Sequence, residues 1–206
     1  MDPRFRGDDK INSENHKMPS ILLTAPAVEP LTLAEAKAYL RVETPDDDDL
    51  IAALIAGARI HVEAETRRAL ITQSWRLSRD AWPPDGRLAV LPVPLQTLTA
   101  VRVYDESNVS HALDTQTFVP DLAGSALVFA PWALPMPGRS AAGIELDVVC
   151  GYGAGAADVP EPLRQAIRLL VGHWYENRGV VAIGHETAVL PVTVAALLAP
   201  YRVLSL

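Results

Sequence analysis

The feature that most constrains the fold is a change in hydrophobic spacing near residue 71. Upstream of it, hydrophobic residues recur at helical intervals, namely at Ile51, Leu54, Ile55, Ala58 and Val62. This pattern predicts an amphipathic helix with one buried face. From Ile71 to Ser78 larger side chains alternate with small or polar ones, as in a strand with one face in water. Helical spacing returns at residues 163–174, so the chain must combine helical and strand-built parts.

Further short strands are expected after the first one, at residues 87–91, 100–104, 117–120, 126–129 and 144–150. Turn signals separate them, such as the sequence WPPDG at residues 82–86. The chain has 17 prolines, and they concentrate around this region. Short strands with turns between them predict an antiparallel sheet or a small sandwich.

Capping signals define the upstream helices. Thr32 and Glu35 form a T-x-x-E capping box, which predicts a short helix from there to about Arg41. A second, longer helix begins at the four carboxylates of residues 46–49, because acidic groups are stabilised at a helix N-terminus. On its polar side, Glu63 and Arg67 stand at i,i+4, as an ion pair would.

Helices also close the chain. Pro160 suits the start of a third helix, which we expect to end near Gly179. A short helix follows at about residues 191–198, and residues 200–206 form a tail.

We therefore predict an α+β fold, in which a helical bundle core carries an inserted antiparallel β-sheet or sandwich subdomain and an extended C-terminal tail. The expected division is an N-terminal extension at 1–20, helical core at 21–70, β-rich insert at 71–150, helical core at 151–199 and tail at 200–206. The extension is polar and is expected to be disordered or not native to the protein.

Charge and composition exclude several classes of protein. The 206 residues carry a net charge of −7, which argues against gripping nucleic acid through its phosphates. The single cysteine, Cys150, excludes an internal disulfide framework and a Cys-rich zinc site. No apolar stretch approaches the roughly 20 residues of a membrane span, and no signal peptide is recognisable. We expect a soluble, intracellular protein.

No motif predicts catalysis or a cofactor. The glycines at 151, 153 and 155 lack the spacing of a dinucleotide-binding loop, and Ser125 lacks a nucleophile elbow. His61 with Glu65, or His173 with Glu176, could each supply half of a metal site, with His185 as a further ligand. No spacing fixes a complete set of ligands. We expect no catalytic residue, no metal and no cofactor.

Two groups of residues are candidates for contact with other chains. Tyr175 and Arg178 lie beside the apolar stripe of the third helix, and both residue types are common at interfaces. With Arg67 they form our predicted subunit interface. The apolar tail either docks on its own domain or is offered to another chain.

The order of several segments resembles the phage head–tail connector (adaptor) proteins, which include the adaptors of gene transfer agents. The segments are LTLAEAKAYLRV at 31–42 with the acidic helix start after it, VPEPLRQAI at 159–167 continuing into HWYENR at 173–178, and PVTVAALLAPYR at 191–202. The resemblance covers roughly residues 22–206, and its β-region is the least diagnostic part.

The resemblance implies a structural protein rather than an enzyme. Members form a ring of roughly twelve subunits beneath the portal protein, with heterologous contacts between neighbours. The ring extends the DNA channel and receives a stopper or tail-completion protein. The chain would then belong to a virion or phage-like particle, at the head–tail interface, after assembly in the bacterial cytoplasm. Double-stranded DNA would pass without specific binding, and no membrane would be involved.

The same resemblance suggests roles for particular residues. The predicted portal-docking residues are Pro200, Tyr201, Arg202, Val203 and Leu204. Four carboxylates could line the channel and repel passing DNA, namely Asp46, Asp47, Asp48 and Asp49. The alternatives are a stopper or tail terminator, or a small ligand-binding protein or enzyme whose pocket gathers Asp147, His173 and Glu176.

Overall fold

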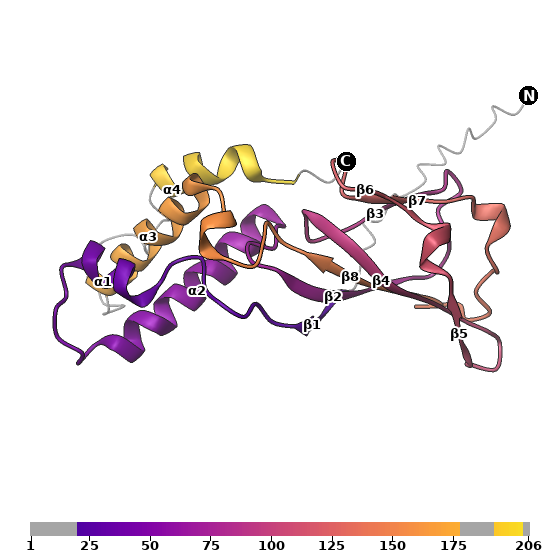
Figure 1. Cartoon of the computed structure of the whole chain (residues 1–206), viewed down its shortest axis with the longest axis horizontal. Helices are drawn as coiled ribbons and strands as arrows, with labels where there is room; N and C mark the ends of the chain where they lie inside the picture. The colour runs from indigo at the N-terminus through magenta and orange to yellow at the C-terminus, as the bar shows by residue number, and fades with distance from the viewer. Residues whose placement is uncertain (1–19, 178–191, 204–206) are drawn as a thin grey trace, which may run out of the picture.

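A computed structural model describes residues 20–177 and 192–203. Helices gather at one end of the molecule and strands at the other (Figure 1). The α-helices are α1 (Leu33–Leu40), α2 (Asp48–Thr66), α3 (Glu161–Glu176) and α4 (Val192–Leu198). The strands are β1 (Ser20–Thr24), β2 (Gln73–Arg79), β3 (Arg87–Ala89), β4 (Leu95–Tyr104), β5 (Ser110–Leu113), β6 (Val119–Asp121), β7 (Ala126–Val128) and β8 (Ile144–Cys150). The mixed helix and antiparallel-sheet composition predicted from the sequence is confirmed.

The helical half is built around α3. α2 packs along its lower side and α4 along its upper side (Figure 1). α3 buries an apolar face that includes Leu163, Ile167 and Leu170. The predicted capping box is present at α1, where Thr32 Oγ1 accepts from Glu35 N at 3.2 Å and Glu35 Oε2 accepts from Thr32 N at 2.9 Å.

The β half contains two antiparallel sheets with one shared core. The larger sheet has the order β1-β2-β8-β4-β5 and the smaller one β3-β7-β6. Alternate residues of β8 point into this core. An aromatic cluster closes it, with the rings of Trp82, Phe118 and Phe129 within 5.2–5.8 Å of one another.

Two strands were not expected from the sequence. β1 pairs with β2, with Ile21 opposite Arg76, whereas the sequence predicts a disordered or non-native extension up to residue 20 and a helical core at residues 21–70. Its three consecutive apolar residues are all exposed, so no alternation marks the strand. β5 is equally exposed and short. The larger sheet is therefore not a simple insert at residues 71–150, because it also recruits the segment before α1.

A polar network joins the two halves. Glu63 of α2 accepts hydrogen bonds from Leu70 N at 2.9 Å and from Gln73 Nε2 of β2 at 2.8 Å. Its other oxygen pairs with Arg59 at 2.8 Å, and Arg59 also binds Glu29 at 2.7 Å. The predicted Glu63–Arg67 pair is therefore wrong. Arg67 instead ends α2 in the left-handed conformation, with φ of 55°.

Candidate interaction surfaces

The acidic start of α2 is partly used within the subunit. Asp47 accepts a hydrogen bond from the Tyr175 hydroxyl of α3 at 2.5 Å, and Asp48 pairs with Lys37 of α1 at 2.5 Å. These contacts tie three helices together. Asp46 and Asp49 are exposed. The structure thus divides the four predicted channel carboxylates into two that hold helices and two that face solvent.

The three residues predicted for the subunit interface differ in exposure, and one of them lies outside the described residues. Arg67 is exposed at the end of α2, while Tyr175 is half-buried and bonded to Asp47 within the chain. Arg178 lies outside the described residues, as does His185.

Three of the five predicted docking residues fold onto the C-terminal end of α2. Val203 N donates to Thr66 O at 3.2 Å, and Arg202 pairs with Glu65 at 2.6 Å. Arg68 Nε donates to Tyr201 O at 2.6 Å. Pro200 is exposed, and Leu204 lies outside the described residues. The segment is therefore anchored on its own subunit while Pro200 and part of Arg202 remain accessible.

Arg68 is the centre of this anchor. Its guanidinium lies 5.8 Å from the centre of the Tyr201 ring and 5.9 Å from that of Tyr152, which favours cation–π attraction to both rings. Burial raises the pKa of Tyr152. The anchor brings together the end of α2, the connection after β8 and the C-terminal segment.

The outer face of the larger sheet carries a charge cluster that the sequence did not reveal. Asp147 accepts two hydrogen bonds from Arg76, at 2.7 and 2.9 Å, and one from Arg102 at 2.8 Å. These Arg76 hydrogen bonds, with Arg102 beside them, hold the pKa of Asp147 below its usual range. Glu145 lies 3.6 Å from Arg76 and accepts from the Tyr104 hydroxyl at 3.1 Å. The alternation of β8 was the available signal, since it places both carboxylates on one face.

The three residues that a ligand-binding or catalytic pocket would require, Asp147, His173 and Glu176, do not lie in one pocket. Asp147 is bound within the sheet cluster. His173 and Glu176 instead line a cavity of about 550 Å³ between α1 and α3, together with Tyr39 and Arg41. The geometry gives this alternative no shared pocket.

The remaining candidate metal ligands and the single thiol make contacts within the subunit or are buried in it. The His61 ring meets Trp174 edge-on at 6.1 Å, and Glu65 is paired with Arg202. Burial raises the pKa of Cys150 to about 12. Within residues 20–177 and 192–203, no three His, Cys, Asp or Glu side chains are grouped so as to hold a metal ion.

The glycine-rich segment after β8 is a tight connection. Gly151 has a φ of +133°, and a Cβ there would lie 2.6 Å from Ile71 O. Gly151 N donates to Pro94 O at 2.9 Å. These constraints explain glycine at this position without a ligand.

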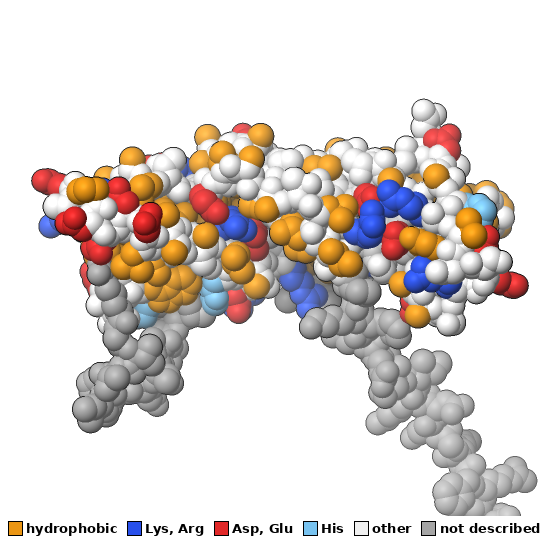
Figure 2. All heavy atoms as spheres, turned by 90° about the horizontal axis from the view of Figure 1, so that it is seen from below, with side chains coloured by type: hydrophobic (Ala, Val, Ile, Leu, Met, Phe, Trp, Pro, Cys, Tyr) orange, Lys and Arg blue, Asp and Glu red, His pale blue; other side chains and the backbone are white. Residues whose placement is uncertain are grey.

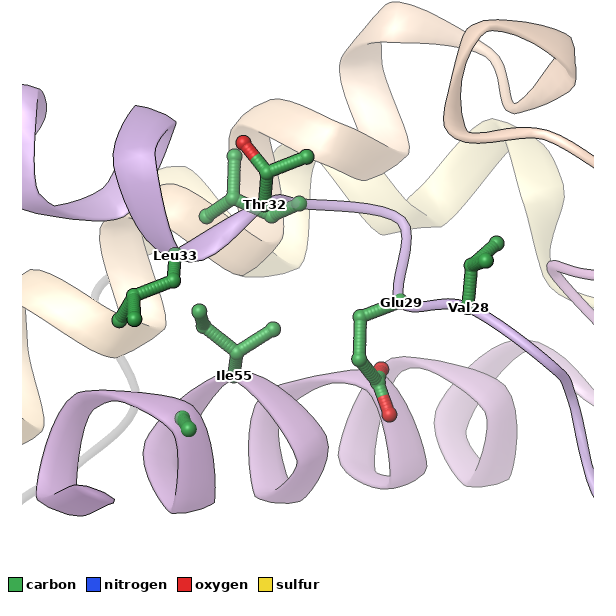
Figure 3. Close-up of a pocket in the computed structure, with 7 residues that line it drawn as sticks. Val28, Glu29, Thr32, Leu33 and Ile55 are labelled. Carbon is green, nitrogen blue, oxygen red and sulfur yellow. The ribbon is translucent and has the colours of Figure 1, made fainter. Parts of the chain in front are cut away.

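A second hollow, of about 280 Å³, lies between α2 and the segment that precedes α1. Figure 3 shows Ile55 rising from α2 toward Thr32 and Leu33, while Glu29 points down toward α2. The Glu29 carboxylate is bound to Arg59. The hollow is mostly apolar and offers no reactive group.

The sequence matches no protein-family model, and no curated protein is detectably similar. In the described part of the chain, no helix is long and apolar enough to cross a membrane.

Solved structures do show similarity. A chain in the neck of an empty gene transfer agent particle, computed with C6 symmetry, matches with a TM-score of 0.76 and 28% identity, over 92% of this chain and 97% of that chain. A chain in the virion of a native gene transfer agent particle matches with a TM-score of 0.73 and 28% identity, at the same coverage. A chain in the neck of a native particle, computed with C12 symmetry, gives 0.70 and 28%, over 90% and 97%. These similarities support a structural component of the particle neck, at the head–tail interface and within a homo-oligomeric ring.

Proposed function

We propose that this chain is an adaptor subunit of a gene transfer agent or related phage-like particle. Copies of it form a ring of roughly twelve beneath the portal, extend the DNA channel and join head to tail. The subunit acts structurally and catalyses no reaction. The observation that carries the proposal is the similarity to gene transfer agent neck chains over nine-tenths of the sequence.

The charge distribution suits a surface along which DNA passes. The chain is acidic overall, with a net charge of −7, and Asp46 and Asp49 expose their carboxylates at one end of α2. Negative charge gives no anchor for DNA phosphates. In this proposal the two aspartates face the channel, whereas Asp47 and Asp48 hold α2 against α3 and α1.

Portal docking is assigned to the C-terminal segment, from Pro200 to Leu204. Because Val203 is bonded to Thr66 at the end of α2 and Tyr201 to Arg68 just after it, the docking surface includes the end of that helix. Arg202 is the accessible charged group, with its side chain 42% exposed.

A matched pair of variants separates docking from internal stability. Arg202→Ala and Glu65→Ala each remove the same exposed ion pair, worth about 0–1 kcal/mol. We expect Arg202→Ala to weaken binding of the purified chain to portal rings at least several-fold, and Glu65→Ala to leave it unchanged. Equal binding by both variants would contradict the role of Arg202.

The adaptor role is tested against the stopper role by light scattering of the purified chain with purified cognate portal. An adaptor forms a ring-sized complex with portal alone. A stopper or tail terminator joins only after another neck protein has been added. A complex that requires that third protein would contradict the adaptor assignment.

A further inference from the structure

The solvent-facing side of α2 has an unusual composition. Between Asp49 and Glu65 every exposed residue of this helix is apolar, namely Leu50, Ala52, Ala53, Ile60 and Ala64. Ile60 is 58% exposed and Leu50 36%. Isolated apolar residues are normal on a protein surface, but a charge-free side extending over four turns of helix is not.

The spacing on this side is that of a helix-packing seam. Leu50, Ala53, Gly57, Ile60 and Ala64 follow one another at intervals of three, four, three and four residues. We name these five residues the α2 seam; four of them are exposed, and the fifth, Gly57, is half-buried beside Trp174 of α3. Alternating intervals of three and four are typical of a helix that packs against another helix. The buried side of α2, at Ile51, Ile55, Ala58 and Val62, already fills the core of the subunit, so the seam is a second packing side.

Neighbouring helices show what an ordinary exposed side looks like. α3 carries Glu161, Arg164 and Arg168 on its outer side, joined by ion pairs. Figure 2 views the molecule from below, the side on which α2 lies in Figure 1, and shows hydrophobic side chains gathered over the helical half. The absence of charge on the outer side of α2 is therefore not a property of the whole helical half, since α3 carries charges there.

A complementary side occurs on α4. Residues 192–201 contain no charged side chain. Val194 and Leu198 are buried in the core, whereas Val192, Ala196 and Ala199 are exposed, at intervals of four and three. We name these three residues the α4 face, although Ala199 begins the 3-10 turn directly after α4. Val192 is 82% exposed.

The two surfaces lie on opposite sides of α3, since α2 packs below it and α4 above it (Figure 1). A closed ring of identical chains uses heterologous contacts, in which one surface meets a different surface of the neighbour. Surfaces on opposite sides of one subunit satisfy this requirement, and their small residues let two helices approach closely.

We propose that the α2 seam of one subunit packs against the α4 face of a second copy of this chain, and that this contact repeats around the ring. This contact rests on the proposed function, in which copies of the chain form a ring. It adds the two surfaces through which neighbouring copies meet. The C6 and C12 symmetry of the similar neck structures favours a second copy of this chain as the partner of the α2 seam.

The test is cysteine cross-linking in assembled particles. The only native thiol, Cys150, is buried, so it contributes no background. Two double variants join the surfaces: Ile60→Cys with Val192→Cys, and Ala53→Cys with Ala196→Cys. Controls are each single variant, and Val109→Cys with Val192→Cys, because Val109 is 53% exposed in the distant β half.

We expect a short thiol cross-linker to give a ladder of dimers, trimers and larger species from at least one double variant. The single variants and the Val109 control should remain monomeric. Particles that contain the chain in normal amount but yield no ladder would overturn the α2–α4 contact. Dimers from Ile60→Cys alone would overturn it in favour of a symmetric α2–α2 contact.

The same experiment separates this inference from the proposed function. Absence of the unmodified chain from purified particles contradicts the neck assignment. Its presence without a ladder contradicts only the proposed contact.

Discussion

The two halves of the molecule differ in the charge that their exposed surfaces carry. The β half places charges on the outer face of its larger sheet and neutralises them within the subunit, where Asp147 binds Arg76 and Arg102. The helical half leaves the α2 seam and the α4 face free of charge. The charges on the sheet face find partners within a single subunit, whereas in our proposal the uncharged helical surfaces find theirs on a second copy of the chain.

The largest effects should come from the two cores. Leu170→Ala in the helical core and Leu146→Ala in the sheet core each remove a fully buried side chain, at a cost of about 2–5 kcal/mol. Because Glu63 links α2 to β2, we expect the halves to unfold together, so either variant should lower one common midpoint.

Denaturant unfolding followed by circular dichroism and tryptophan fluorescence checks this expectation. The two probes should give coincident transitions in the wild type and in both variants. Separate transitions, each shifted by only one variant, would contradict the cooperative link between the halves.

A smaller effect is expected for the charge cluster of the sheet. Asp147→Asn removes the carboxylate that binds Arg102 and leaves Arg76 with Glu145 alone, which should lower the free energy of unfolding by about 2 kcal/mol at neutral pH. The pKa of Asp147 is lowered in the folded state, chiefly by the Arg76 hydrogen bonds. Its stabilisation is therefore fully present above the unfolded-state value of about 3.9, and is lost as pH falls through the folded-state pKa.

The difference in stability between wild type and Asp147→Asn should accordingly shrink as pH is lowered from about 5 toward and below that folded-state value. Asp46→Asn is the control, because Asp46 is exposed and should change stability by less than about 0.5 kcal/mol. A difference that stays constant from neutral to acidic pH would show that Asp147 does not stabilise through its charge.

The smallest effect on folding is expected at the α2 seam. Ile60→Glu and Val109→Glu alter side chains of similar exposure, 58% and 53%, and each should change the free energy of unfolding by about 0.5 kcal/mol or less. Only Ile60→Glu should reduce the amount of chain in purified particles, because it buries a charge at the proposed contact. If purified particles contain Ile60→Glu and Val109→Glu chains in equal amount, the α2 seam is not a contact between subunits.

Local signals predicted the helices well. The Thr32–Glu35 capping box and the acidic start of α2 mark ends that depend on nearby residues alone. The change of period near Ile71 likewise placed β2, because alternation is a local property.

The sequence predicted less where structure depends on distant partners. β1 has no alternation, and its place in the sheet comes from the free edge of β2 about 50 residues away. Glu63 binds Arg59 and Gln73 rather than Arg67, because the left-handed end of α2 takes Arg67 out of the helix. The Asp147 cluster joins three strands whose order could not be read from spacing. The fold of Tyr201 and Val203 onto α2 likewise depends on contacts more than 130 residues apart.

The central claim is that this chain forms a ring at the particle neck. It is tested most directly by electron cryomicroscopy of necks from particles that contain the chain, reconstructed without imposed symmetry. We expect repeated copies around the channel directly beneath the portal, with α2 of each copy beside α4 of its neighbour. A neck that lacks the chain, or that holds it without a closed ring, would contradict the account.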